Sequence, residues 1–172
     1  MTTTDELAAL VGKEAAGELN DALEKIQHCV GQLNDDQVWQ RPQAGMNSIA
    51  NLLLHLAGNL QQWIVCGLGG ETDRRNRPAE FAAEGGLARD ELLGQLSETV
   101  RRAAAVLTAL DGENLARKRV IQAFEVTGAG AMFSSVAHFR GHTQEIIHLT
   151  RRLMGEGYQV HWEPKSQAEG AP

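Results

Sequence analysis

Histidines are the residues of this chain best suited to metal chemistry, and two of the six stand four positions apart. If their segment is helical, His138 and His142 lie one turn apart on the same face, so both imidazoles can reach one metal ion. Such a pair also arises by chance. The zinc-protease pattern is missing, because Phe139 stands where a general-base glutamate would follow the first histidine. The pair therefore indicates part of a metal site, and a further ligand must come from another segment.

A third histidine occurs in a segment whose apolar residues recur at helical spacing. On a helical wheel, His55 lies on the flank of this apolar stripe and shares a polar seam with Asn59 and Cys66. A lone histidine there is usually a packing residue. Three protein ligands with open positions for water, however, are the usual arrangement of a reactive metal site. We therefore expect His55, His138 and His142 to bind one divalent metal ion together.

Metal-bound histidines usually donate their second ring N–H to an acceptor. Glu145 lies about one turn after His142 on nearly the same strip of the helix, and Ser135 lies about one turn before His138. Together with Asn59 beside His55, these residues are predicted to support the ligands, although Glu145 could equally be a surface carboxylate.

Two other kinds of site compete with this prediction. Glu145 and His148 form one Glu-x-x-His pair of a carboxylate-bridged di-iron bundle, but such a site needs a second pair, which the sequence lacks. Cys66 could be a nucleophile, yet it lies roughly 16 Å along the helix axis from His55 at 1.5 Å per residue. A buried, unreactive cysteine is the favoured interpretation. His28 is interpreted as a boundary residue, and His161 as part of the tail.

Four long helices are predicted to position these residues. They cover roughly residues 4–34, 48–67, 87–110 and 132–154, with Thr4 and Asn47 as the expected caps of the first two. A polar loop is expected over 71–86, and a long crossover with a short extended piece over 112–130. Helices of this length joined in this way are typical of an all-α four-helix bundle with long crossover loops.

Composition limits the classes of function. The 172 residues suit one domain, expected over 1–163 with a disordered tail over 164–172, and a net charge of −6 argues against a nucleic-acid partner. The short basic cluster of Arg74, Arg75 and Arg77 is either a solvated loop or a contact for an anionic ligand. No apolar run could span a membrane and the first residues do not resemble a signal peptide. A cytoplasmic protein with two reduced cysteines is therefore expected.

The segments that carry the histidines resemble those of the DinB/YfiT-like metalloenzyme superfamily. The resemblance covers roughly residues 5–155 and is carried by Asn47-Ser-Ile-Ala-Asn-Leu-Leu-Leu-His55-Leu-Ala-Gly-Asn59 and by His138-Phe-Arg-Gly-His142-Thr-Gln144-Glu-Ile146. It implies that His55, His138 and His142 bind a divalent ion, commonly zinc or nickel, in a bundle that often forms a homodimer. The loop over 71–86 and the tail around Trp162 fall outside the common pattern.

Some members of this superfamily are transferases or isomerases that use low-molecular-weight thiols. An ion held by three neutral histidines keeps its full charge, so it can acidify a bound water or ionise a thiol. The resemblance favours a thiol S-transferase acting on a small molecule, and a metal-dependent hydrolase is the alternative. A non-catalytic metal- or ligand-binding stress protein, and a plain structural bundle, also remain open.

Overall fold

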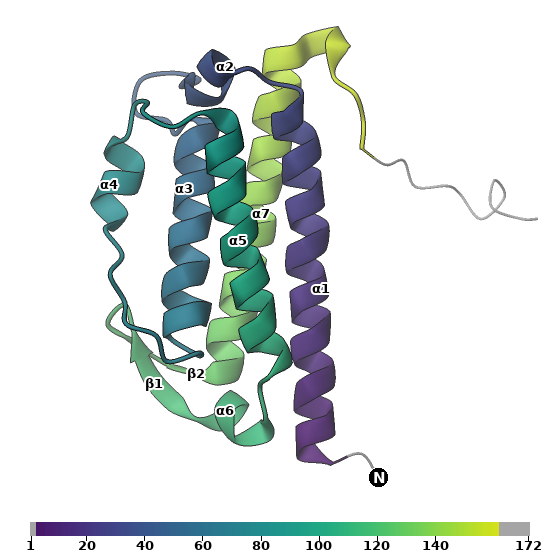
Figure 1. The fold of residues 1–172 in the computed structure, drawn as a ribbon, viewed down its shortest axis with the longest axis vertical. Coiled ribbons are helices and arrows are strands. Elements are labelled where there is room, and N and C mark those ends of the chain that lie inside the picture. Colours follow the sequence, from purple (N-terminus) through teal and green to yellow (C-terminus); the bar gives the residue numbers. More distant parts are fainter. Residues whose placement is uncertain (1–2, 162–172) are drawn as a thin grey trace, which may run out of the picture.

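Four long helices dominate the computed structural model, which describes residues 3–161. They are α1 (Thr4–Gly31), α3 (Ile49–Leu60), α5 (Arg89–Thr108) and α7 (Gly128–Met154). Helices α1 and α3 each pack against both α5 and α7, so they occupy opposite corners of the bundle (Figure 1). The predicted all-α four-helix bundle is confirmed.

The core of the bundle is aliphatic, as the low aromatic content of the sequence predicts. Leu19 of α1, Leu56 of α3, Leu96 of α5 and Ile146 of α7 are fully buried, and each such side chain stabilises the fold by about 1.5–3 kcal/mol. Phe139 is the largest buried side chain. It follows His138 directly, so packing of Phe139 into the core turns the neighbouring histidine toward the outside of the bundle.

Hydrogen bonds at the helix starts correct two of the predicted caps. Thr3, not Thr4, caps α1, because only Thr3 places Glu6 three residues on, where its side chain completes a capping box. Ser48, not Asn47, caps α3 through a reciprocal pair of bonds with Asn51. These bonds fix the start of α3 and therefore the direction in which His55 projects.

Helix α7 begins four residues earlier than predicted, at Gly128 instead of Met132. The run Gly128-Ala-Gly130, which belongs to the crossover expected over 112–130, forms the first turn of the helix instead. The Thr127 side chain accepts a hydrogen bond from the Gly130 amide and so caps the helix. A Cβ at Gly128 would lie 2.1 Å from the Asn114 carbonyl oxygen, so this glycine permits close packing.

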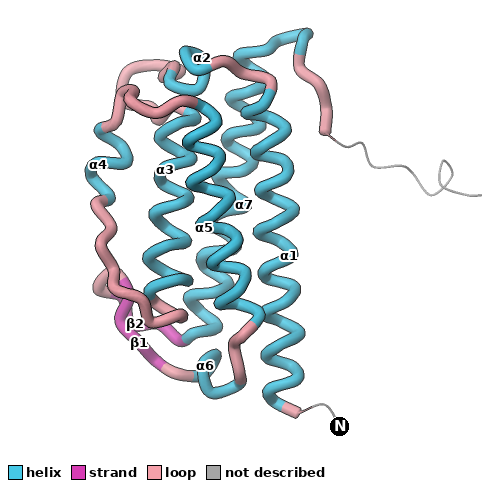
Figure 2. Tube along the Cα trace, in the orientation of Figure 1, coloured by secondary structure: helices cyan, strands magenta, loops and turns pink. Residues whose placement is uncertain are grey.

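Short elements fill the connections (Figure 2). They are α2 (Asp35–Trp39), the π-helical turn η1 (Gln61–Cys66), α4 (Arg77–Ala82), α6 (Gly112–Ala116), the antiparallel strands β1 (Lys118–Ile121) and β2 (Phe124–Thr127), and the 3-10 turn η2 (Gly155–Gly157). The extended piece expected within 112–130 is this hairpin. We call residues 71–86, which include α4 and run along the outer side of α3, the strap (Figure 1). None of the described helices is long and apolar enough to cross a bilayer.

Candidate metal centre

Three histidines from two helices meet on the outer side of the α3–α7 pair. His55 projects from α3, and His138 and His142 project from α7. The Nε2 atoms of His55 and His138 are 2.9 Å apart, and the ligand atoms of all three residues lie within 4.8 Å of one another. In residues 3–161, no other group of histidine, cysteine, aspartate or glutamate side chains converges in this way. The three predicted ligands therefore form a group that can hold one metal ion.

The separations and protonation states of these rings fit a divalent ion. Ligands of a tetrahedral zinc stand about 3.3 Å apart, given bond lengths of about 2.0–2.1 Å, so small ring movements would suffice. Burial lowers the pKa of His55, and burial with the charges of the neighbouring histidines lowers the pKa of His138 to about 4. Both rings are therefore neutral near pH 7, as metal binding requires.

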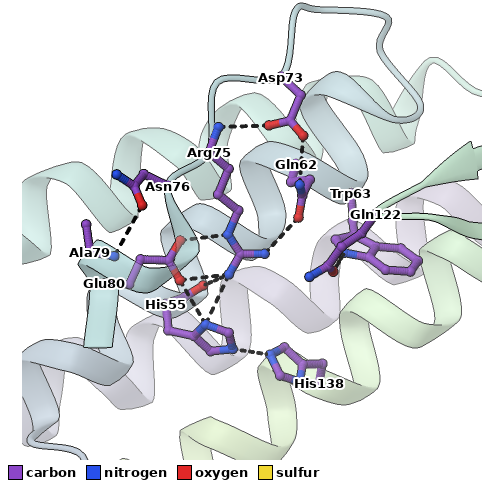
Figure 3. Close-up of polar contacts among 10 residues, drawn as sticks. All are labelled: His55, Gln62, Trp63, Asp73, Arg75, Asn76, Ala79, Glu80, Gln122 and His138. Carbon is purple, nitrogen blue, oxygen red and sulfur yellow. Dashed lines mark hydrogen bonds and ion pairs between the residues drawn. The ribbon is translucent and has the colours of Figure 1, made fainter. Parts of the chain in front are cut away.

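The strap supplies a carboxylate that orients His55 (Figure 3). Nδ1 of His55 lies 3.0 Å from Oε2 of Glu80 and 3.0 Å from Nη2 of Arg75. We assign the ring proton to Nδ1, which donates to Glu80, because Nη2 donates to this same carboxylate oxygen at 2.8 Å. Arg75 donates to both oxygens of the same carboxylate, from Nε at 2.6 Å and from Nη2 at 2.8 Å. The Arg75 and Glu80 side chains are only 3% and 10% exposed. With Nδ1 engaged in this way, the Nε2 lone pair of His55 faces the other histidines.

A glycine in the middle of α3 makes room for this ion pair. A Cβ at Gly58 would lie 2.1 Å from Oε1 of Glu80 and 2.9 Å from Nε of Arg75. Any larger residue would therefore push the pair away from the helix surface. Gln62, one turn further on, accepts a hydrogen bond from Nη1 of Arg75 at 3.0 Å and helps to fix the guanidinium.

The three residues predicted to support the ligand histidines, Glu145, Ser135 and Asn59, have different surroundings. Oε2 of Glu145 lies 2.7 Å from Nδ1 of His142, which leaves the Nε2 of this histidine free to face the cluster. Ser135 and Asn59 line a cavity beside His55 and His138, but neither forms a hydrogen bond with these rings in the described part of the chain.

Residues proposed for the competing sites lie elsewhere. His148 is exposed on α7, and its partner in the Glu-x-x-His pair, Glu145, is bonded to His142 instead. Cys66 is buried, its Sγ accepts a hydrogen bond from Gln61, and burial raises the pKa of its thiol. Neither residue joins the histidine cluster.

Sequence reasoning missed Glu80, Arg75 and Gly58. Arg75 was grouped with Arg74 and Arg77 in a basic cluster, and the solvated-loop interpretation is wrong for Arg75, which is almost fully buried. Glu80 and His55 are 25 residues apart and belong to different elements, so no local spacing could have paired them. The helical Gly58 was the one available signal of a close contact.

Two hollows are lined in part by Arg75. The smaller, about 240 Å³ in volume, is lined by His55 and His138 and reaches Gln122 at the tip of the hairpin. The larger, about 860 Å³ and wide open, lies between the strap and α3 and is lined by Glu80 and Arg102 but by none of the ligand histidines. A ligand can therefore reach His55 and His138 through the smaller hollow but not through the larger one.

Comparisons with known proteins agree with this architecture. Residues 9–167 match the model of a family described as a protein of unknown function, DUF1572. A conserved protein from Enterococcus faecalis is 17% identical with a TM-score of 0.70, over 84% of this chain and 98% of that one. A DinB-like protein from Bacillus subtilis, YjoA, is 16% identical with a TM-score of 0.64, over 86% and 94%. No curated protein matches the chain.

Proposed function

The chain belongs to the DUF1572 family and has a DinB-like fold, and we propose that it binds one divalent metal ion, zinc or nickel, through His55, His138 and His142. The observation that carries this proposal is the convergence of three imidazole ligand atoms within 4.8 Å. The hydrogen bonds that Glu80 accepts from His55 and Glu145 accepts from His142 support it, because carboxylates that accept the second ring N–H orient histidine ligands in metal sites.

The proposed activity is transfer of a small thiol to an electrophile. A divalent ion supplies Lewis acidity, which lowers the pKa of a water or thiol ligand. Among residues 3–161, no aspartate or glutamate lines the cavity beside His55 and His138, and Glu80 and Glu145 are engaged by histidines. Metal-dependent hydrolases often add a carboxylate as general base. A thiol ionises without one, so this lining favours thiol transfer over hydrolysis.

Metal content tests the proposal directly. Purified protein incubated with zinc or nickel should carry about one ion per chain by elemental analysis. His142→Ala should lose the ion and keep its helical circular dichroism, because the ligand contributes little to the apolar core. His148→Ala is the matched control, since it removes an exposed histidine from the same helix and should bind metal normally.

Two outcomes would contradict the metal site. One is less than roughly a tenth of an ion per chain in the wild type, and the other is equal loss in both histidine variants. The thiol activity has a separate assay with a reduced thiol and 1-chloro-2,4-dinitrobenzene. A C–S bond forms, chloride leaves and the thiol proton goes to buffer. Metal uptake without turnover for any of several thiols would leave a metal-binding protein and refute the transferase.

A further inference from the structure

The cavity beside the ligand histidines has a polar lining and a restricted size. Its volume of about 240 Å³ falls below the ≈ 300–1,000 Å³ of sites for drug-sized ligands, so it suits a smaller molecule. Besides His55 and His138, its walls include Asn59, Trp63, Arg75, Arg77, Gln122 and Ser135. The indole of Trp63 is the one large apolar surface among these residues.

The charge of this lining is positive. Arg75 is neutralised by its two hydrogen bonds with Glu80. Arg77 is exposed and lies over the ring of Phe81, with 4.8 Å between its Cζ and the ring centroid, and none of the ion pairs formed by residues 3–161 includes it. A guanidinium with no carboxylate partner at the wall of a small cavity is a binding group for an anion.

The cavity also contains hydrogen-bond donors that the protein does not use. Ser135 is 2% exposed, and its hydroxyl has no hydrogen-bond partner within the described residues. Gln122 accepts a hydrogen bond from the Trp63 indole N–H at 3.1 Å, which leaves its own amide N–H groups available. A buried hydroxyl without a partner is costly, and an oxyanion in the cavity would satisfy it.

The hairpin holds Gln122 at this cavity in an unfavourable backbone conformation. Gln122 and Ala123 have φ angles of +51° and +66°, in a two-residue turn that usually contains asparagine or glycine. Strained backbone of this kind recurs at ligand-binding sites, where the surrounding structure maintains it. The turn places the Gln122 side chain beside Trp63, where its side-chain oxygen accepts the indole N–H (Figure 3).

From these observations we propose that the cavity binds a small carboxylate, with Arg77 as its charged partner and Ser135 and Gln122 as further donors. This proposal rests on the proposed function, because it treats the bound carboxylate as part of the substrate of the metal site. Arg77, His55 and His138 all line this one cavity, so a single small molecule can contact both the guanidinium and a ligand histidine.

Titration of the protein with propionate tests this subsite, with the neutral propionamide as its isosteric counterpart. The indole N–H signal of Trp63 in a ¹⁵N-correlated NMR spectrum, assigned with Trp63→Phe, reports binding inside the cavity. Propionate should shift this signal saturably at constant ionic strength, in both zinc-loaded and metal-free protein. Propionamide should bind at least about tenfold more weakly, because it lacks the charge that Arg77 recognises.

Two arginines of the strap provide a matched pair of variants. Arg77→Gln should weaken propionate binding at least about tenfold in both metal states, and Ser135→Ala should weaken it by a smaller factor. Arg74→Gln removes the same charge from an exposed residue that lines the larger hollow, so it should bind propionate as the wild type does. The dispersion of the NMR spectrum shows whether each variant is folded.

The outcomes separate this subsite from the metal site. Equal binding of propionate and propionamide, or equal effects of Arg77→Gln and Arg74→Gln, would overturn the subsite. Tighter binding of inorganic phosphate would overturn the assignment to a carboxylate. A protein that takes up no metal but binds propionate through Arg77 would refute the proposed function and retain the subsite. Metal uptake with no saturable propionate shift in either metal state would overturn the subsite and retain the metal site of the proposed function.

Discussion

At the scale of single residues, the second nitrogen of a histidine decides whether its ring is oriented as a ligand. Nδ1 of His55 is engaged by Glu80 and Nδ1 of His142 by Glu145, so both rings present Nε2 to the centre of the cluster. These two carboxylates raise the basicity of the rings and limit their rotation. Glu80 differs from Glu145 because it is also held by Arg75 in a nearly buried ion pair.

We therefore predict that Glu80→Gln lowers the affinity for zinc by about 10- to 100-fold, the usual effect of losing a second-shell partner. The amide cannot accept a charge-assisted hydrogen bond from His55. The variant should also unfold at lower urea concentration, because the nearly buried charge of Arg75 loses its carboxylate partner. Competition with a chromophoric zinc chelator measures the affinity.

Glu71→Gln is the control for this prediction. Glu71 belongs to the same strap, but it is exposed and pairs with Arg102, away from the histidines. Its substitution should leave the zinc affinity unchanged. Equal zinc affinities for Glu80→Gln and the wild type would show that the contact with His55 has no influence on the metal.

At the scale of elements, the ligands and their supports come from different parts of the chain. Helices α3 and α7 carry the three histidines, and both are fixed by core packing. The strap carries Glu80 and Arg75 and reaches α3 at Gly58, while the hairpin brings Gln122 to the cavity. The helices therefore set the ligand geometry, and the connections determine the chemistry around it.

The contact between the strap and α3 makes Gly58→Ala an informative change. Alanine in a helix interior normally stabilises a protein by up to about 1 kcal/mol relative to glycine. At Gly58, however, the Cβ would overlap the ends of the Glu80 and Arg75 side chains. These ends can move, so we expect the fold to persist while the ion pair withdraws from His55 and zinc affinity falls at least severalfold.

The same substitution at Gly17 is the control, because a Cβ there meets nothing within 4 Å. Gly17→Ala should raise the free energy of unfolding, measured with urea, and leave zinc binding unaffected. If Gly58→Ala were as stabilising as Gly17→Ala and bound zinc normally, the strap would not depend on this glycine.

At the scale of the whole molecule, burial of neutral histidines links stability to pH. The pKa of His138 falls from its ordinary value of 6.5 to about 4, chiefly because of burial. Between these two values the unfolded chain binds a proton at this site that the folded chain does not bind. The free energy of unfolding therefore decreases as the pH is lowered through this range.

We predict that metal-free protein loses stability from about pH 6.5 to about pH 4, and that His138→Gln loses less over the same range. Urea unfolding at several pH values measures the stability of both proteins as a function of pH. Carboxylates that titrate in the same pH range are present in both proteins, so their contribution cancels in the comparison. Parallel curves would mean that His138 is not buried in its neutral form.

The homodimer, the cytoplasmic location and the extent of the domain over 1–163 stay predictions. The tail over 164–172, which was expected to be disordered, lies outside the described residues.

The local pattern of residues was enough to predict the bundle, to single out the three histidines and to offer Glu145 as one of two interpretations, a support for His142 or a surface carboxylate. Each of these depends on helical spacing, which places residues three or four apart on one face. The convergence of His55 with the other two was expected from its place beside the apolar stripe and from the resemblance, but only the packing of α3 against α7 brings the rings together. Glu80, Arg75 and Gln122 could not be found in this way, because they come from connections. The position of a connection is decided by packing between segments that are far apart in the sequence, as at Gly58, and no periodicity records such contacts.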